Sequence, residues 1–263
     1  MRGTLVSAAA GIMLAALVGS PACAQTAPDV LSDEQKRFVK FNSVSTLYHE
    51  FGHALIHTMR LPILAREEDA ADVLNVILMD HLNDGAYADM IASETAKYYL
   101  LEDKAREAGG YSYNFSGDHA PYIRRHYNVL CLHYGANPKV RQPFLAKFVV
   151  PNELLSTCEY RRSEANRGWD WVLRQIEHGR GGYPSLQFFE DNQPSSEAET
   201  VARDALRAEV QYMADQFTLP VPIGVRFMDC DRDANAYYYP DTNEIVFCRE
   251  YAGAILDLLQ YQP

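Results

Sequence analysis

The sequence has little positive charge and no long block of like charge. Its 263 residues include 24 lysines and arginines against 35 aspartates and glutamates, which gives a net charge of −11. This balance argues against nucleic acid as a partner, because phosphate binding needs a positive surface. No acidic or basic run indicates a disordered tail, and no internal repeat is visible. With 48% apolar and 22% charged residues, the chain has the composition of a soluble globular protein with a substantial core.

The chain also lacks an apolar run long enough to cross a membrane. Its longest run, near the N-terminus, covers about a dozen residues, whereas a spanning helix needs about 20. The run is followed by Ala22-Cys23-Ala24, which fits the cleavage site of a secretory signal peptide. We therefore predict a signal peptide over 1–24 and bacterial export of a mature chain, 25–263. That chain is expected to form a single domain without a membrane span, either secreted or periplasmic. A lipid anchor on Cys23 is the rival interpretation.

Cysteine is scarce. Five are present, and Cys23 would leave with the signal peptide. The even number that remains, in an exported chain, indicates two disulfides. The simplest connectivity pairs Cys131 with Cys158 and Cys230 with Cys248. Four buried thiols are the alternative interpretation.

Apolar residues that recur every three or four positions predict that most of the chain is helical. Residues 25–41 lack clear periodicity, so the first helix is expected to begin near Asn42, which can cap it, and to end before Pro62. Further helices are predicted over 66–82, 86–107, 120–135, 137–149, 152–178 and 197–217.

The C-terminal part has a different character. Segments 219–230 and 235–248 are rich in β-branched and aromatic residues. An antiparallel meander there would place Cys230 and Cys248 at the same end of the sheet. Its predicted strands are 221–229, 235–239 and 244–248. The expected fold class is therefore α+β, mainly helical over 42–217 with a small antiparallel β-meander within 219–250.

One short motif carries the chemistry. His49-Glu50-Phe51-Gly52-His53 is an H-E-x-x-H pattern inside the first predicted helix. Side chains at i and i+4 are neighbours on a helix, so the two imidazoles can converge on one zinc ion. Glu50 can then face a metal-activated water as a general base. The motif alone is weak evidence, because a chain of this size contains it by chance at on the order of 1%.

The next predicted helix supplies a third ligand. The segment 66–74 contains Glu68-x-x-x-Asp72. If the two helices pack antiparallel, Glu68 can reach the metal, and Asp72 can accept the free N–H of a ligating histidine. Glu67 is the alternative ligand. A solvated acidic cluster at the start of a helix would explain Glu67 and Asp69 but not the apolar stripe that follows.

Two further residues of the first helix need an interpretation. His57 lies eight residues after His49, about 12 Å along the helix, so we predict that it does not bind the metal. Gly52 costs about 1 kcal/mol relative to alanine in a helix. We interpret it as a site of close approach by the second helix or by substrate; mere tolerance is the alternative.

These motifs resemble those of the gluzincins, zinc peptidases with H-E-x-x-H on one helix and a glutamate ligand on the next. The Glu-x-x-Ala-Asp pattern at 68–72 is similar to that of the membrane CAAX prenyl protease and heat-shock protease HtpX family. More closely, about 40–250 resembles a family of bacterial exported proteins regarded as metallopeptidases from their motif. Further matches are 118–135, the cysteine at 158 and 235–250. The resemblance implies a zincin-like domain, Zn²⁺ as cofactor, the ligands His49, His53 and Glu68, and Glu50 as base.

The order of the elements is unusual for such a peptidase. In many gluzincins a strand that flanks the substrate cleft precedes the zinc helix, whereas here the similar segment 235–248 follows it. One hypothesis is a permuted sheet whose edge strand borders the cleft, since peptides commonly bind by adding to a sheet edge. The alternative is a disulfide-pinned hairpin remote from the metal.

A zinc hydrolase also needs a donor for the developing oxyanion. Our first choice is His119, beside Asp118; the other candidates are His126, Tyr127 and Tyr237–Tyr239. Arg124 and Arg125 are expected to form a solvated or ion-paired face. The predicted function is zinc-dependent hydrolysis of a peptide or protein substrate. The alternatives are a catalytically silent, zinc-stabilised binding or structural protein of the cell envelope, and a protein without metal in which the motif arose by chance.

Overall fold

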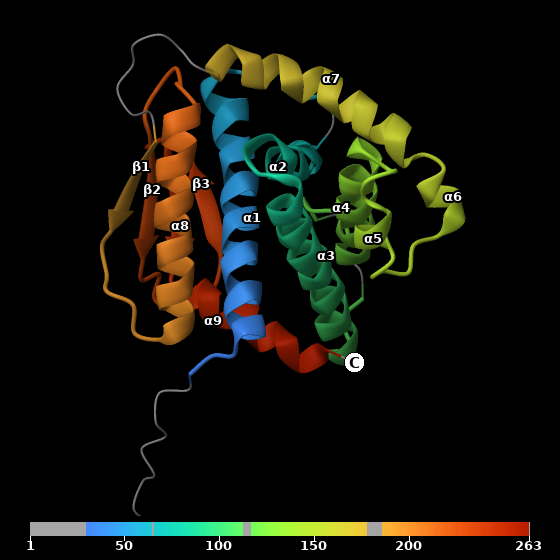
Figure 1. Ribbon diagram of the computed structural model, residues 1–263. Coiled ribbons are helices and arrows are strands. Elements are labelled where there is room, and N and C mark those ends of the chain that lie inside the picture. The colour runs from blue at the N-terminus through green and yellow to red at the C-terminus, as the bar shows by residue number, and fades with distance from the viewer. Residues whose placement is uncertain (1–29, 65, 113–116, 178–185, 263) are drawn as a thin grey trace, which may run out of the picture.

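The computed structural model describes residues 30–64, 66–112, 117–177 and 186–262. The predicted signal peptide therefore lies outside the described residues. Within these ranges, no helix combines the length and the apolar character that crossing a bilayer requires. The fold is α+β and mainly helical, as predicted, with one small sheet at its side (Figure 1).

The central element is helix α1, Asp33–Thr58, which begins well before the predicted start at Asn42. Its N-terminus is a capping box, in which Ser32 Oγ accepts from Gln35 N and Ser32 N donates to Gln35 Oε1. Asn42 and Ser43 are buried inside the helix, where they hydrogen-bond backbone carbonyls one turn earlier. The predicted start was wrong because these residues have the chemistry of caps but bond back into the helix instead.

Most other helices lie close to their predicted positions: α2 Glu67–Leu82, α3 Gly85–Ala108, α4 Tyr122–Ala136, α7 Cys158–Ile176 and α8 Glu197–Gln216. Between α4 and α7 the expected long helices are replaced by single turns, α5 Gln142–Leu145 and α6 Asn152–Leu155. Prolines explain the interruption, because Pro143 lies in the first turn of α5 and Pro151 directly precedes α6. The predicted disulfide between Cys131 and Cys158 joins α4 to α7.

The sheet differs from the predicted meander. Its strands are β1 Leu186–Glu190, β2 Ile223–Met228, β3 Ala236–Tyr239 and β4 Glu244–Cys248, in the order β1-β2-β4-β3. The hairpin β3–β4 is antiparallel as expected, but β2 pairs in parallel with both β1 and β4. The fully antiparallel meander is therefore wrong. A meander would pair β2 with β3, whereas β4 lies between these two strands and pairs in parallel with β2. Neither β1 nor the closing helix α9, Glu250–Asp257, was predicted.

The second disulfide forms as predicted, but the strands bring its cysteines together in a different way. Met228 at the end of β2 lies opposite Cys248 at the end of β4 in the parallel register. Cys230 follows β2 directly, so both cysteines lie at the carboxyl end of neighbouring strands and pair with each other.

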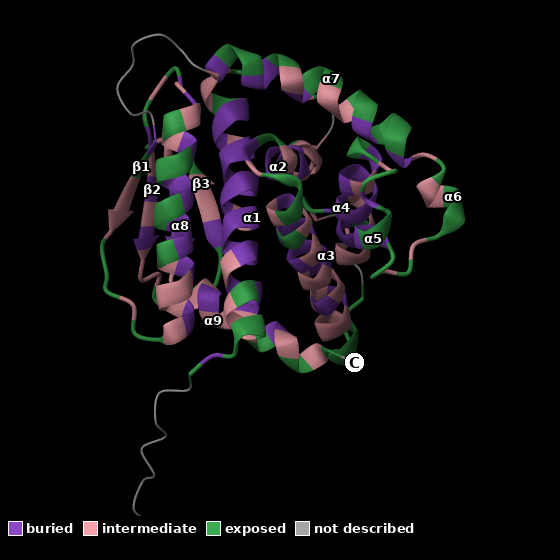
Figure 2. Cartoon of the chain, viewed as in Figure 1, coloured by how far each residue is buried: buried purple, intermediate pink, exposed green. Residues whose placement is uncertain are grey.

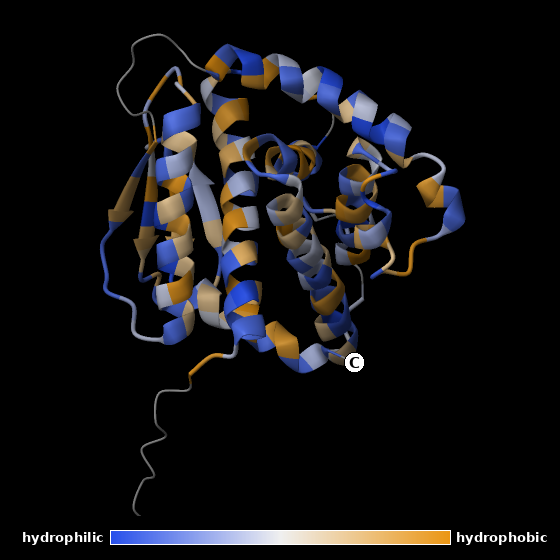
Figure 3. Ribbon diagram, viewed as in Figure 1, coloured by the Kyte–Doolittle hydropathy of each residue, from blue (hydrophilic) through white to orange (hydrophobic). Residues whose placement is uncertain are grey.

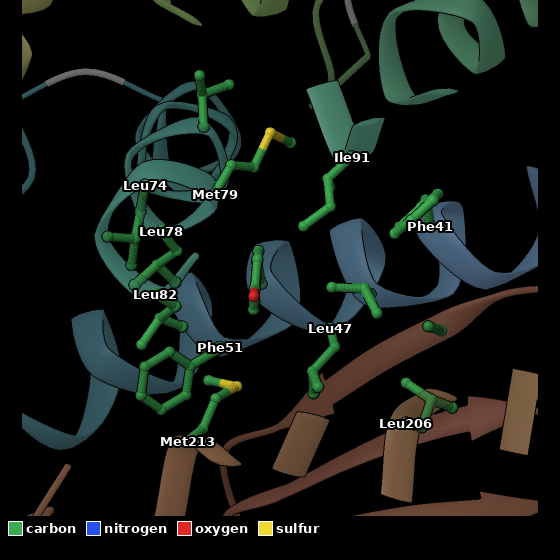
Figure 4. Packing of buried hydrophobic residues seen from close by; sticks show 14 of the residues in the cluster. Phe41, Leu47, Phe51, Leu74, Leu78, Met79, Leu82, Ile91, Leu206 and Met213 are labelled. Atoms are coloured by element: carbon green, nitrogen blue, oxygen red, sulfur yellow. The ribbon is translucent and has the colours of Figure 1, made fainter. Parts of the chain in front are cut away.

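Helix α1 lies between the sheet with α8 on one side and α2 to α4 on the other (Figure 1). Helix α1 is buried around much of its circumference (Figure 2). Figure 3 shows that hydrophilic residues are interspersed with apolar ones along the chain. In Figure 4, Phe51 of α1 contacts the group formed by Leu82 of α2 and Met213 of α8. Apolar side chains of α1 thus pack into the main core, which fixes the position of its polar face.

Candidate metal centre

Helices α1 and α2 pack unusually close together at Gly52. A Cβ atom at this position would lie 2.9 Å from Cα of Ala71, a backbone atom of α2 that cannot move aside cheaply. The interpretation of Gly52 as a site of close approach by the second helix is confirmed. The contact brings the start of α2, with its glutamates, against the His49–His53 face of α1.

Three donor atoms meet where the helices touch. His49 Nε2 lies 3.1 Å from Glu68 Oε2 and 3.3 Å from His53 Nε2, and His53 Nε2 lies 3.4 Å from Glu68 Oε2. A tetrahedral zinc ion with bonds of 2.0–2.1 Å requires its ligand atoms to be about 3.3 Å apart. The three atoms are therefore spaced like one face of such a tetrahedron, and two imidazoles with one carboxylate are a donor set suited to zinc.

The electrostatics of this cluster favour a bound cation. Burial disfavours the charged form of Glu68, but hydrogen bonds from His119, His49 and His53 hold its pKa well below the usual range. Burial also opposes protonation of His49, yet Asp72 and Glu68 outweigh it and raise the pKa of His49 to about 9. The carboxylates favour a positive charge on these imidazoles. They would also favour a metal ion that took the place of the protons.

Asp72 lies beside the ring nitrogen of His49 that faces away from Glu68. Its Oδ1 is 3.0 Å from His49 Nδ1, although Nδ1, which is buried, makes no hydrogen bond of good geometry. Arg125 holds the carboxylate through two hydrogen bonds, Nε to Oδ2 at 2.8 Å and Nη2 to Oδ1 at 2.6 Å. Arg125 is thus a buried, ion-paired residue. Arg124, in contrast, is exposed, and its Nη2 comes no nearer than 3.7 Å to the Oδ2 atom of Asp69.

Glu50 lies beside the three donors and lines the same cleft, but it makes none of their close contacts. Its side chain is almost wholly buried. Burial raises its pKa, and the neighbouring His49 and His53 oppose this effect only in part. A carboxylate in this position can accept a proton and return it.

His119 is the fourth group at the cluster. Its Nε2 is 2.8 Å from Glu68 Oε2, and its ring stacks on that of His49 at a centroid distance of 6.0 Å. His49, Glu68 and His119 offer ligand atoms that all lie within 4.8 Å of one another, so this trio could also hold a metal ion. Unlike the others, His119 is exposed and precedes α4 on a loop.

The alternative ligand, the histidine predicted not to bind metal and two other candidate oxyanion donors make contacts of their own. Glu67, the alternative ligand, contacts the opposite side of the His53 ring, with Oε1 2.7 Å from Nδ1. His57 is directed to the sheet, where its Nδ1 is 3.2 Å from the Tyr238 hydroxyl. His126 contacts the carbonyl of Ala96. Tyr127 packs against the His126 ring, 5.0 Å between centroids.

The sheet borders the cluster formed by His49, His53 and Glu68. A cleft of about 920 Å³ contains His49, Glu50, His53, Glu68 and His119 on one side. The same cleft is also lined by the start of β3 and the residue before it, including Asn235, Ala236, Tyr237 and Tyr238. The hairpin is therefore not remote from the H-E-x-x-H helix, and β3, at the end of the strand order, is the strand that faces the cleft.

Several residues of the cleft could not be found from the sequence. Tyr98 and Tyr99 of α3, Tyr122 of α4 and Tyr251 of α9 line it together with Thr46 of α1. The sequence gives no signal for these tyrosines, because α9 was not predicted and the packing of α3 on α4 cannot be derived from local patterns. Only Thr46 carried a usable signal, since it lies one helical turn before Glu50.

Comparison with known proteins gives one match. A family model described as "Putative metallopeptidase" (DUF4344) matches residues 20–173. This range contains every donor of the cluster and ends before β1. No curated protein and no solved structure matches the chain significantly.

Proposed function

Because the chain belongs to the putative metallopeptidase family, we propose that it is a zinc-dependent peptidase in which Glu50 is the general base. The observation that carries the proposal is the triangle of His49 Nε2, His53 Nε2 and Glu68 Oε2, with sides of 3.1, 3.3 and 3.4 Å. These three residues would hold the metal, and Asp72, held by Arg125, would orient His49.

When bound, zinc acts as a Lewis acid that polarises a carbonyl and lowers the pKa of a water molecule to about 7. Glu50 accepts a proton from the attacking water and then delivers it to the nitrogen of the departing amine. The raised pKa of Glu50, which results mainly from burial, supports this role, because a carboxyl group that titrates closer to neutrality exchanges protons more effectively.

His119 is the proposed donor to the oxyanion. Its Nε2 lies at the edge of the cluster, 2.8 Å from Glu68 Oε2, and its exposed ring lies in the cleft wall. To act in this way, His119 would exchange its contact with Glu68 for the substrate oxygen as charge develops there.

The free side of β3 is the proposed binding edge for the peptide backbone. Within the described residues, β3 pairs with β4 alone, and its residues line the same cleft as the donors. An extended peptide that added to this edge would present its carbonyl groups to the cluster.

We also propose that residues 1–24 are removed on export and that 25–263 act as a single domain outside the cytoplasm. Two disulfides support an oxidising compartment.

The decisive experiment compares Glu50→Gln with Glu209→Gln. Glu209 is a matched control, because it is equally buried, also has a pKa raised by burial, and accepts a hydrogen bond from the core residue Tyr48. Each protein is analysed for zinc and incubated with a peptide library read by mass spectrometry. We expect Glu50→Gln to keep stoichiometric zinc and lose at least about 100-fold in turnover, while Glu209→Gln retains activity.

The other results separate the alternatives. Zinc in the native protein without any turnover would favour the silent binding protein of the envelope. Undiminished proteolysis by Glu50→Gln would exclude the proposed base, and purified protein free of metal would exclude the metal site.

A further inference from the structure

The cleft has a tyrosine wall beside Glu50. On the side that faces the start of α1, it is lined by Thr46, Tyr98, Tyr99, Tyr122 and Tyr251, which we call the aromatic recess. These residues come from α1, α3, α4 and α9, so the recess exists only in the folded chain. Thr46 lies one turn before Glu50 on the same helix, which places the recess directly against the proposed base.

The walls of the recess are held rigidly. The rings of Tyr98 and Tyr99 meet edge to face at 5.4 Å, and Tyr99 stacks on Tyr122 at 6.5 Å between centroids. At the back, Tyr98 donates to Glu102 at 2.9 Å, and the hydroxyls of Tyr98 and Tyr251 are 2.8 Å apart. Thr46 also hydrogen-bonds Tyr251. A pre-organised wall of this kind binds a matching group without first having to order its own side chains.

The five residues of the recess carry no formal charge. Around them, Arg125, whose guanidinium lies 4.3 Å above the Tyr99 ring, is paired with Asp72 by two hydrogen bonds, Glu102 accepts from Tyr98, and Arg106 lines the same cleft. A charged side chain placed among the five recess residues would lose water without an ion pair from any of them. Neutral aromatic rings instead find edge-to-face and stacked partners.

We propose that the aromatic recess binds the side chain of the substrate residue that supplies the departing amine, and that this residue is aromatic. The placement rests on the proposed function, because Glu50 must reach the nitrogen that receives the proton. The side chain of that residue begins on the carbon next to this nitrogen and therefore lies against the recess. Tyrosine rings from three helices then make the recess selective for a flat ring over an aliphatic or charged group.

The first test varies the residue after the cleaved bond in a peptide library. We expect phenylalanine and tyrosine to be preferred over alanine by at least about tenfold in kcat/KM, and over leucine, lysine and aspartate. Thr46→Phe fills the recess and should abolish this preference while zinc content stays unchanged. Thr58→Phe, a matched change on α1 away from the recess, should leave the preference intact.

The second test does not depend on turnover. Phenylalanine amide, which mimics the amine product, is titrated by calorimetry into zinc-loaded Glu50→Gln protein against the amides of alanine, leucine and lysine. Tighter binding of phenylalanine amide, lost in Thr46→Phe, supports the recess even if no library peptide is cut, in which case only the proposed function fails. Equal binding of all amides, or cleavage with a flat profile at this position, overturns the recess while leaving the peptidase in place.

Discussion

The helical region, α1 to α7, and the sheet region, β1 to α9, contribute to the cleft in different ways. All proposed metal ligands lie on two adjoining helices of the first region, and the family match also covers it. The second region supplies a strand edge and one tyrosine of the wall. The comparison teaches that the chemistry here depends on local helical spacing, whereas the shape of the cleft depends on contacts between distant segments.

The largest expected effect tests whether the metal depends on the helical region alone. Loss of a residue that hydrogen-bonds a metal ligand typically lowers metal affinity about 10- to 100-fold, so loss of a ligand itself in Glu68→Ala should lower it by more. Tyr238→Phe, in β3 of the sheet region, should leave zinc affinity unchanged. Competition with a chromophoric chelator measures both, and full zinc affinity in Glu68→Ala would contradict the assigned ligand set.

Removing the disulfides compares the stability of the two regions. Replacing Cys131 and Cys158 by serine, or Cys230 and Cys248 by serine, should each cost about 2–5 kcal/mol in urea unfolding. The loops are of similar length, with separations of 27 and 18 residues, so the two costs should be similar. Cys230 lies in the segment that leads into β3, so only loss of the second disulfide should loosen this segment and raise KM. An equal rise in KM for both pairs would contradict this difference.

A buried carboxylate gives the helical region a pH-dependent stability. Burial disfavours ionisation of Asp80, but His133, Arg141 and Arg162 prevail and lower its pKa from 3.8 to about 2. A pKa lowered by folding stabilises the protein above about pH 4, and this contribution disappears as the pH falls through 2. Asp80→Asn should therefore be about 2 kcal/mol less stable than the native protein at pH 7, with a difference that shrinks between pH 4 and pH 2.

The control for this titration lies in the sheet region. Asp215 is exposed on α8, so Asp215→Asn removes the same charge without breaking a buried network. Its effect on unfolding should stay within about 0.5 kcal/mol. A destabilisation by Asp80→Asn that did not change with pH would mean that the carboxylate charge is not responsible.

The smallest expected effect concerns two helical glycines. Gly52→Ala should cost about 1–2 kcal/mol, because the clash with Ala71 forces the helices apart. Gly253→Ala on α9, where an added Cβ meets nothing within 4 Å, should instead stabilise by about 0.5–1 kcal/mol. Thermal unfolding of both variants measures the contrast, and stabilisation by Gly52→Ala would show that the helices are not in such close contact.

The features that could be predicted are those that depend on residues close together in the sequence. His49, Glu50 and His53 follow from one helical period, and Glu68 with Asp72 from the next helix. The start of α1 was missed because Asn42 and Ser43 resemble caps. Proline positions explain why α5 and α6 are single turns.

The remainder depends on contacts that no local pattern encodes. Between β2 and β4 the chain forms β3 at the end of the sheet, and it then returns so that β4 pairs in parallel with β2. His119 was chosen for its place beside Asp118 before a predicted helix, but only the folded structure shows that its Nε2 lies 2.8 Å from Glu68 Oε2. Tyr251 could not be assigned to the cleft wall, because it lies on a helix that the sequence did not predict.

The position of β3 at the end of the sheet has a consequence for handling the protein. Its outer side presents unpaired backbone amides and carbonyls within the described chain, and Tyr239, exposed at its end, adds an aromatic surface. Such an edge is a template for any extended segment, including one from another copy, so concentrated preparations are at risk of edge-to-edge aggregation. A peptide ligand that fills the edge would then protect the protein in storage and crystallisation.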